Sequence, residues 1–166
     1  MNILISIVIL LVYTIIMIKI GGSIPPSLSA SVFNLPTNKR WIWTVVLFAV
    51  CFLCVPTYIE KTSENTQFLA FLAIAGLAFV GAAPLVKFSD DNLQFRVHEI
   101  GAIVCAVCSQ LVLVFNNAWL LLMWIIYLGL FIWYTKDAGR NFNNWRTKIF
   151  WAEMICFINT FTYCLI

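Results

Sequence analysis

The feature that most constrains this chain is a series of apolar stretches, each about as long as a membrane is thick. A helix needs roughly 17 to 25 predominantly apolar residues to cross the hydrocarbon core of a bilayer. The sequence contains six such runs, at about residues 2–20, 41–58, 66–86, 97–115, 118–134 and 149–166. A chain with this pattern is expected to fold as an all-α, polytopic transmembrane bundle of six helices.

The composition agrees with a membrane environment. Charged residues make up 10% of the chain and hydrophobic residues 63%, whereas about a quarter of the residues of a soluble domain are charged. The lipid bilayer is therefore the expected surrounding partner. The ten Lys and Arg residues are spread over the loops without forming a basic stripe, so nucleic acid is not expected as a partner.

The segments between the apolar runs hold charges or turn-forming residues, and none is long enough to separate two domains. We therefore expect a single bundle over residues 1–166. The shortest connection is Asn116–Asn117, where a tight turn is expected because asparagine tolerates the left-handed conformation. The first run has no basic segment before it and no convincing small-residue cleavage site after it. It is expected to stay as the first helix, not to be removed as a signal peptide.

The distribution of basic residues predicts the orientation of the bundle. Nine of the ten Lys and Arg residues fall in the first, third and fifth loops, and Lys61 alone falls on the other side. Loops rich in Lys and Arg stay in the cytoplasm, so both termini are expected to be extracytoplasmic. Five of the tryptophans lie near the predicted cytoplasmic boundary, where amphipathic rings prefer to sit; these are Trp41, Trp43, Trp133, Trp145 and Trp151.

The cysteines include two C-x-x-C pairs, "CFLC" at Cys51 and Cys54 and "CAVC" at Cys105 and Cys108. This spacing suggests zinc or thiol chemistry in a soluble protein. Here the pairs lie inside apolar runs, far from any Lys, Arg or His that would stabilise a thiolate. A three-histidine metal site is excluded because the chain has one histidine. We expect the cysteines to serve packing, with no metal and no cofactor bound.

The segment "FLAFLAIAGLAFVGAAP" is rich in alanine and glycine. Small side chains let helix backbones approach closely within a membrane, so this helix is expected at the centre of the bundle. An alternative is that it lines a narrow pore. Pro84 is expected to end the helix and to leave carbonyl groups that need partners.

Two of the predicted helices carry polar residues on one face. Glu99 and Ser109 follow helical spacing in 97–115, and Glu153 and Thr160 do so in 149–166. Ionisable groups in membrane spans are expensive and normally face the bundle interior. Together with His98, the only histidine, Glu99 and Glu153 form a predicted polar cluster at the cytoplasmic side. The candidate binding residues are therefore Glu99, Glu153, His98, Ser109 and Thr160. Glu99 is expected to turn toward Glu153.

A simpler interpretation of this cluster stays open. Glu99 then lies in the first turn of its helix, where the helix dipole favours a carboxylate, and Glu153 pairs with Arg146 or Lys148. The long loop "GGSIPPSLSASVFNLP" is expected to be an interfacial connector, with Ser27 capping a short helix. The alternative is that this loop contacts a substrate.

The stretches "IPPSLSASVFNL", "RWIWTVVLF", "QFLAFLAIAGLAFVGAAP" and "VHEIGA" resemble a family of small, uncharacterised six-span membrane proteins from gut Bacteroidetes. The resemblance covers most of the chain, in the same order. It implies a multi-pass protein of a bacterial inner membrane with the same bundle. It implies no known reaction and no established site residues.

These observations favour a non-enzymatic membrane module that works as a channel, transporter or sensor, assembles as a homo-oligomer and takes a small ion or a lipid as its ligand. A membrane-embedded enzyme acting on lipid is an alternative, with His98 and either Glu99 or Glu153 as an acid–base pair. A second alternative is a scaffold that recruits another membrane protein. A cavity that reaches Glu153, filled with water or with lipid, would distinguish these functions.

Overall fold

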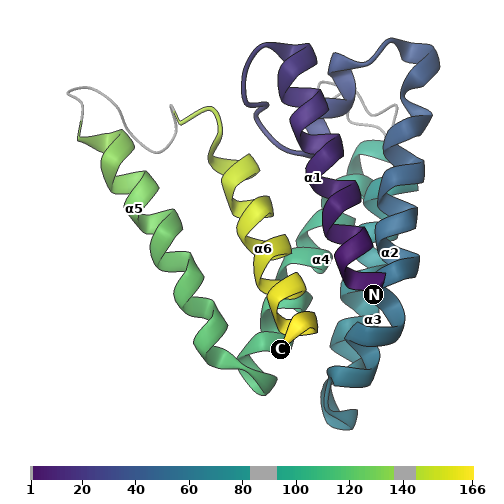
Figure 1. Cartoon of the computed structure of the whole chain (residues 1–166), viewed down its shortest axis with the longest axis vertical. Coiled ribbons are helices and arrows are strands. Elements are labelled where there is room, and N and C mark those ends of the chain that lie inside the picture. Colours follow the sequence, from purple (N-terminus) through teal and green to yellow (C-terminus); the bar gives the residue numbers. More distant parts are fainter. Residues whose placement is uncertain (1, 83–92, 137–144) are drawn as a thin grey trace.

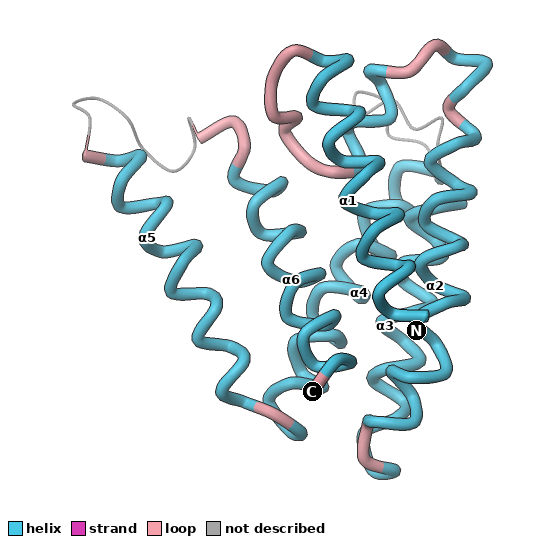
Figure 2. The backbone as a smooth tube through the Cα atoms, viewed as in Figure 1, coloured by secondary structure: helices cyan, strands magenta, loops and turns pink. Residues whose placement is uncertain are grey.

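The computed structural model describes residues 2–82, 93–136 and 145–166, and within these ranges the chain forms helices and loops without a strand. The all-α prediction is confirmed. Figure 2 shows helices joined by loops through the described chain. The six α-helices are α1 (Asn2–Gly21), α2 (Trp41–Lys61), α3 (Gln67–Ala82), α4 (Leu93–Asn116), α5 (Trp124–Thr135) and α6 (Lys148–Leu165). Four short 3₁₀ helices join them: η1 (Ser29–Asn34), η2 (Thr37–Lys39), η3 (Glu64–Thr66) and η4 (Ala118–Met123).

Five helical segments of the described chain are long and apolar enough to cross a membrane: Asn2–Gly21, Thr37–Lys61, Glu64–Ala82, Leu93–Asn116 and Ala118–Thr135. The sixth predicted span corresponds to α6, which forms a helix but is not among these five. Its sequence includes Lys148, Glu153 and Asn159, and polar residues of this kind lower the mean hydropathy of a helix. The six-span count therefore stays a prediction.

Several helix boundaries differ from those expected. The helix predicted at 41–58 continues through Pro56 to Lys61, and the helix predicted at 97–115 begins earlier, at Leu93. The run predicted at 118–134 divides into η4 and α5. Residues 83–86 of the third predicted helix, including Pro84, lie outside the described residues.

The turn at Asn116–Asn117 does not use the left-handed conformation that we expected. Asn117 has a φ of −160°, and no described residue other than glycine has a positive φ. Instead, the side chain of Asn116 stabilises the turn. Its Nδ2 donates to Val112 and to the Thr66 hydroxyl, and its Oδ1 accepts from the Ser63 amide. The turn is therefore stabilised by its contact with the η3 segment, which the local sequence does not reveal.

The helices run up and down between two ends of the bundle (Figure 1). At one end, which we call the long-loop end, α1 ends, residues 22–40 form a loop, and α2, α4 and α6 begin. At the other, the short-turn end, lie η3 and Asn117. Both termini lie toward the short-turn end. This arrangement places every other loop at the same end, as alternating spans require.

The most extensive contact between helices is that of α3 with α4, and α3 also packs along α2. The contact is close because glycines face it. A Cβ built on Gly76 would lie 2.6 Å from the carbonyl oxygen of Gly101 and 2.7 Å from the amide nitrogen of Cys105. Near the end of α3, side chains of α2 bind its carbonyl groups, with Trp43 donating to Val80 and Thr44 to Gly81.

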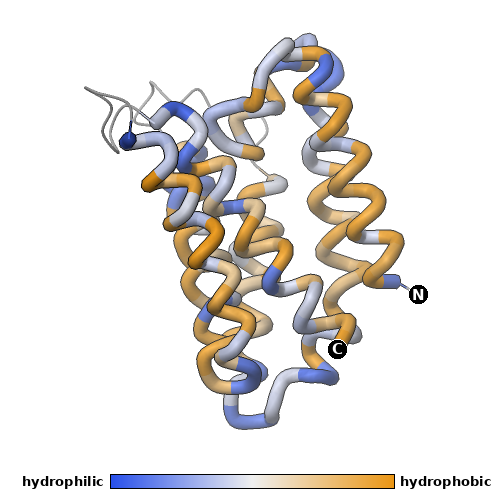
Figure 3. Tube along the Cα trace, turned by 60° about the vertical axis from the view of Figure 1, so that its left-hand side comes forward, coloured by the Kyte–Doolittle hydropathy of each residue, from blue (hydrophilic) through white to orange (hydrophobic). Residues whose placement is uncertain are grey.

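Hydrophobic residues predominate along the helices (Figure 3). Large side chains are widely exposed there, including Phe52 at 72%, Phe71 at 65% and Ile125 at 61%. Soluble monomers rarely expose continuous apolar surface of this extent. The surface and the five long apolar helices are therefore compatible with a membrane protein.

α5 stands apart from the other helices. It has no buried residue, contacts α6 and η4, and diverges from α6 toward the long-loop end (Figure 1). Along one side, the rings of Tyr127, Phe131 and Tyr134 lie against Trp145, which precedes α6. Trp124 and Tyr127, near the beginning of α5, can contribute to an interior site.

Candidate functional site

The main candidate site is a cavity of about 730 Å³ within the bundle. All the helices except α1 contribute to its wall, and so do Leu28 and Ser29 of the long loop. Its volume falls within the roughly 300–1,000 Å³ of small-molecule sites. Most of the wall is formed by aliphatic and aromatic side chains, with few polar groups. Such a wall favours an apolar occupant.

Four of the six cysteines line this cavity: Cys51, Cys54, Cys105 and Cys156. All six are free thiols. No group of three or more His, Cys, Asp or Glu residues that could hold a metal ion occurs in the described part of the chain. The C-x-x-C spacing thus places small, weakly polar side chains along the wall. Cysteine commonly serves as a small apolar residue of this kind.

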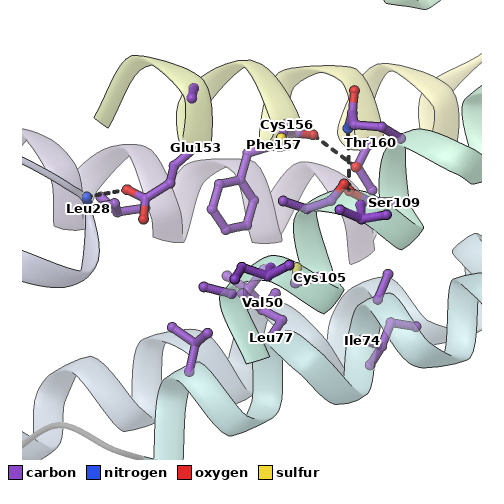
Figure 4. A pocket seen from close by; sticks show the side chains of 18 of the residues that line it. Leu28, Val50, Ile74, Leu77, Cys105, Ser109, Glu153, Cys156, Phe157 and Thr160 are labelled. Atoms are coloured by element: carbon purple, nitrogen blue, oxygen red, sulfur yellow. Dashed lines mark hydrogen bonds between the residues drawn. The ribbon is translucent and has the colours of Figure 1, made fainter. Parts of the chain in front are cut away.

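Among the residues that the structure describes, Glu153 is the one carboxylate on the cavity wall. It lies in the second turn of α6, near the long-loop end, and its side chain is partly buried. Its Oε2 accepts a hydrogen bond from the backbone amide of Leu28 (Figure 4). Within the described chain this is the only hydrogen bond that Glu153 makes, and it forms no ion pair with Arg146 or Lys148 there. The amide stabilises the carboxylate but leaves its other oxygen without a protein donor.

The long loop is folded against the bundle in a way that presents the Leu28 amide. Ser27 accepts a hydrogen bond from the Ala30 amide at the start of η1, 2.9 Å away. Pro26 accepts one from Phe150 of α6 at 3.0 Å, and Ser31 bonds the Tyr13 hydroxyl of α1 at 3.0 Å. Leu28 is 2% exposed. The loop is therefore part of the site as well as a connector.

A second cluster of polar side chains includes Asn159 of α6, which lies about 10 Å along the helix from Glu153 at a rise of ~1.5 Å per residue. Its centre is Gln110 of α4, whose Oε1 accepts from Trp124 of α5 at 3.0 Å and from Asn159 of α6 at 2.9 Å. Gln110 Nε2 donates to Ser109 at 3.3 Å. Gln110 therefore joins three helices by side-chain hydrogen bonds, in a region where the alternative is an unsatisfied polar group in an apolar environment.

The structure brings together three of the five candidate residues. Glu153, Ser109 and Thr160 all line the cavity. The hydroxyl of Thr160 bonds the Cys156 carbonyl of its own helix at 2.9 Å, and that of Ser109 bonds Ala106 at 3.0 Å. Figure 4 shows Ser109 and Thr160 close together and Glu153 toward the opposite end of the cavity.

The other two candidate residues lie elsewhere. His98 is buried but does not line the cavity; it hydrogen-bonds the backbone of Val80 in α3. The side chain of Glu99 is exposed and is also absent from the cavity wall. The expectation that Glu99 turns toward Glu153 is therefore wrong. His98 and Gly101 are the buried residues nearest to Glu99 in sequence, so α4 turns its His98 side inward and its Glu99 side outward.

Sequence reasoning missed the Leu28 amide and the two amide side chains, Gln110 and Asn159. The Leu28 amide could not be found, because a backbone group has no sequence signal. Asn159 is fully buried, and an asparagine within an apolar helix was a signal that could have been used. Gln110 was visible beside Ser109, but its partners come from two other helices.

The arrangement can hold an elongated apolar molecule, with a carboxylate near one end and hydroxyl and amide groups near the other. It offers no metal set, and it does not place His98 beside a carboxylate on the cavity wall. The chain matches no family model, no curated protein and no solved structure.

Proposed function

We propose that this protein is an integral membrane protein that binds a lipophilic molecule inside its bundle, as a transporter- or sensor-like module without enzymatic activity. The observation that carries the proposal is the apolar cavity of about 730 Å³. Its wall favours a lipid-like ligand over a hydrated ion, because it has few groups that could replace the water around an ion. Of the expected ligands, a lipid fits this wall better than a small ion.

The cavity also has a route to the bilayer. Ile103, Val107 and Val114 of α4 line it, and they are 57%, 51% and 45% exposed on the surface of the bundle. α4 has its main contacts with α3, α6 and η4, not with α5. A molecule dissolved in the hydrocarbon can therefore enter sideways past this face of α4.

The alternative of an acid–base enzyme lacks its central pair in this geometry, since His98 does not line the cavity that Glu153 lines. A location in a bacterial inner membrane, with six spans and extracytoplasmic termini, is part of the proposal. It is supported by the distribution of Lys and Arg residues and by the family resemblance described above.

Binding of tritiated dodecanol to the purified protein in lipid nanodiscs tests the proposal, with empty nanodiscs as the blank. We expect saturable binding that Ala106→Phe abolishes, because Ala106 lines the cavity and the larger ring fills it. Ala118→Phe is the matched control, since Ala118 is exposed on η4 and is not part of the wall. Equal binding by both variants and the wild type would show that the cavity is not a binding site.

A further inference from the structure

In the described part of the chain, the cavity combines an apolar wall with a single carboxylate, which has one hydrogen-bond partner. Glu153 accepts one hydrogen bond, from Leu28, and has no other partner within the described chain. An ionisable group in such a position requires a proton or a positive partner, because an isolated charge is poorly solvated in an apolar environment. A ligand that carries a positive charge would supply that partner.

An aromatic ring next to the carboxylate favours the same charge. The ring of Phe157 projects into the cavity beside Glu153 (Figure 4). Trp43 also lines the cavity and is 2% exposed. The faces of such rings attract cations, and ammonium groups bound among aromatic side chains use this attraction. The carboxylate and the Phe157 ring therefore act in the same direction on a positively charged group.

The rest of the cavity suits an apolar tail. Between Glu153 and Thr160 the wall consists largely of aliphatic, aromatic and thiol side chains, including Val50, Leu77 and Cys105 (Figure 4). Among the described residues, the other charged side chain on the wall is that of Lys148, the first residue of α6. It does not pair with Glu153 but has an interaction of its own. The test must therefore distinguish a cationic ligand bound at Glu153 from an anionic ligand bound at Lys148.

We infer that the molecule bound in this cavity is a lipophilic cation, an alkyl amine or alkyl ammonium whose charged group lies against Glu153 and whose tail extends along the apolar wall toward Thr160. This inference rests on the proposed function and specifies the class of its ligand. It assigns Glu153 as the residue that selects for charge.

The experiment compares three tritiated probes with the same chain length in nanodiscs: dodecyltrimethylammonium, dodecanol and dodecanoate. We expect the cation to bind at least about tenfold more tightly than the other two, because the Coulomb attraction between opposite unit charges about 4 Å apart in a protein exceeds the free energy of a tenfold change in affinity. Glu153→Gln should remove this preference while dodecanol binding stays unchanged, which also shows that the variant is folded. Glu153→Asp should keep part of the preference for the cation. Glu99→Gln should keep all of this preference, because Glu99 is exposed and lies outside the cavity.

The outcomes separate this inference from the proposed function. Equal affinity for the three probes, or a cation preference that survives Glu153→Gln, overturns the inference and leaves the lipophilic site in place. Tighter binding of dodecanoate overturns it in favour of an anionic ligand at Lys148. If no probe binds more than to empty nanodiscs, both proposals fail. If Glu153→Gln no longer binds dodecanol, the relative affinities of the wild type for the three probes decide whether the inference holds.

Discussion

At the scale of single residues, the face of the helix on which a carboxylate lies decides its role more than its distance from the end of the bundle does. Glu99 and Glu153 both lie near the long-loop end, in α4 and α6. Glu99 is exposed on the outer surface, whereas Glu153 lines the cavity and binds the Leu28 amide. An exposed carboxylate can be solvated from outside the bundle, whereas one on the cavity wall can also contact a molecule bound in the cavity. This difference makes Glu153 the better candidate for ligand binding.

The glycines of the α3–α4 contact give a second prediction at this scale. Gly76→Ala is expected to destabilise the protein by about 1–3 kcal/mol, because the new methyl group meets backbone atoms that cannot move aside without separating the helices. Gly129→Ala in α5 is the control, since a Cβ there has no neighbour within 4 Å. Thermal unfolding in detergent measures both. A Gly76→Ala variant as stable as Gly129→Ala would show that the two helices are less closely packed than described.

At the scale of elements, α5 is positioned by the ring of Trp145, against which Tyr127, Phe131 and Tyr134 lie, and by one hydrogen bond at its first residue. It has no buried residue, and the hydrogen bond from Trp124 at its first residue to Gln110 of α4 fixes its beginning at 3.0 Å. The same oxygen of Gln110 accepts from Asn159 of α6. One amide therefore sets the separation of three helices around the cavity.

Gln110→Leu is expected to release α5 and to cost about 1–2 kcal/mol, because both the Trp124 and the Asn159 donors lose their acceptor. Trp124→Phe should cost less, since Asn159 keeps its partner. Spin labels at positions 128 and 158, both exposed in the structure, report the distance between α5 and α6 on a cysteine-free background. We expect a broader distance distribution for Gln110→Leu than for the wild type.

Thr135→Val serves as the control on the same helix, because its hydroxyl bonds only carbonyl groups of α5 itself. It should leave the distance between α5 and α6 unchanged. An unchanged distribution in Gln110→Leu would mean that the ring contacts with Trp145 or the surrounding lipid, not the hydrogen bond, position α5.

At the scale of the whole molecule, charge is distributed unevenly between the two ends. Among the described residues, every Lys and Arg except Lys61 lies at or near the long-loop end, and Lys61 lies at the short-turn end. Basic loops are retained in the cytoplasm. The cavity would then have Glu153 near its cytoplasmic end and Gln110 nearer its outer end, which gives a bound amphiphile a defined direction.

Labelling of single cysteines in intact cells tests this orientation. On a cysteine-free background, Glu64→Cys at the short-turn end should react with a membrane-impermeant maleimide, because the short turns are expected outside. Asn38→Cys in the long loop should react only after the cells are opened. The reverse pattern would contradict the orientation and would place Glu153 toward the outside.

The sequence by itself determined that the described chain is helical, where most helices begin and end, and that it is too apolar for a soluble domain. These properties depend on residues close together along the chain, since hydrophobic runs and loop charges are local. The sequence also identified Glu153, Ser109 and Thr160 as polar residues on helix faces, and these three residues line the cavity.

Only the tertiary structure decided which polar residues meet. Helical spacing shows which residues share a face, but the rotation of α4 is set by its packing on α3 at Gly76 and Gly101, and that rotation turns Glu99 away. The partner of Glu153 is a backbone amide 125 residues earlier in the chain, and backbone groups are the same in every sequence. The cavity likewise exists because five helices and a loop enclose a space, and no local pattern encodes that distance between helices.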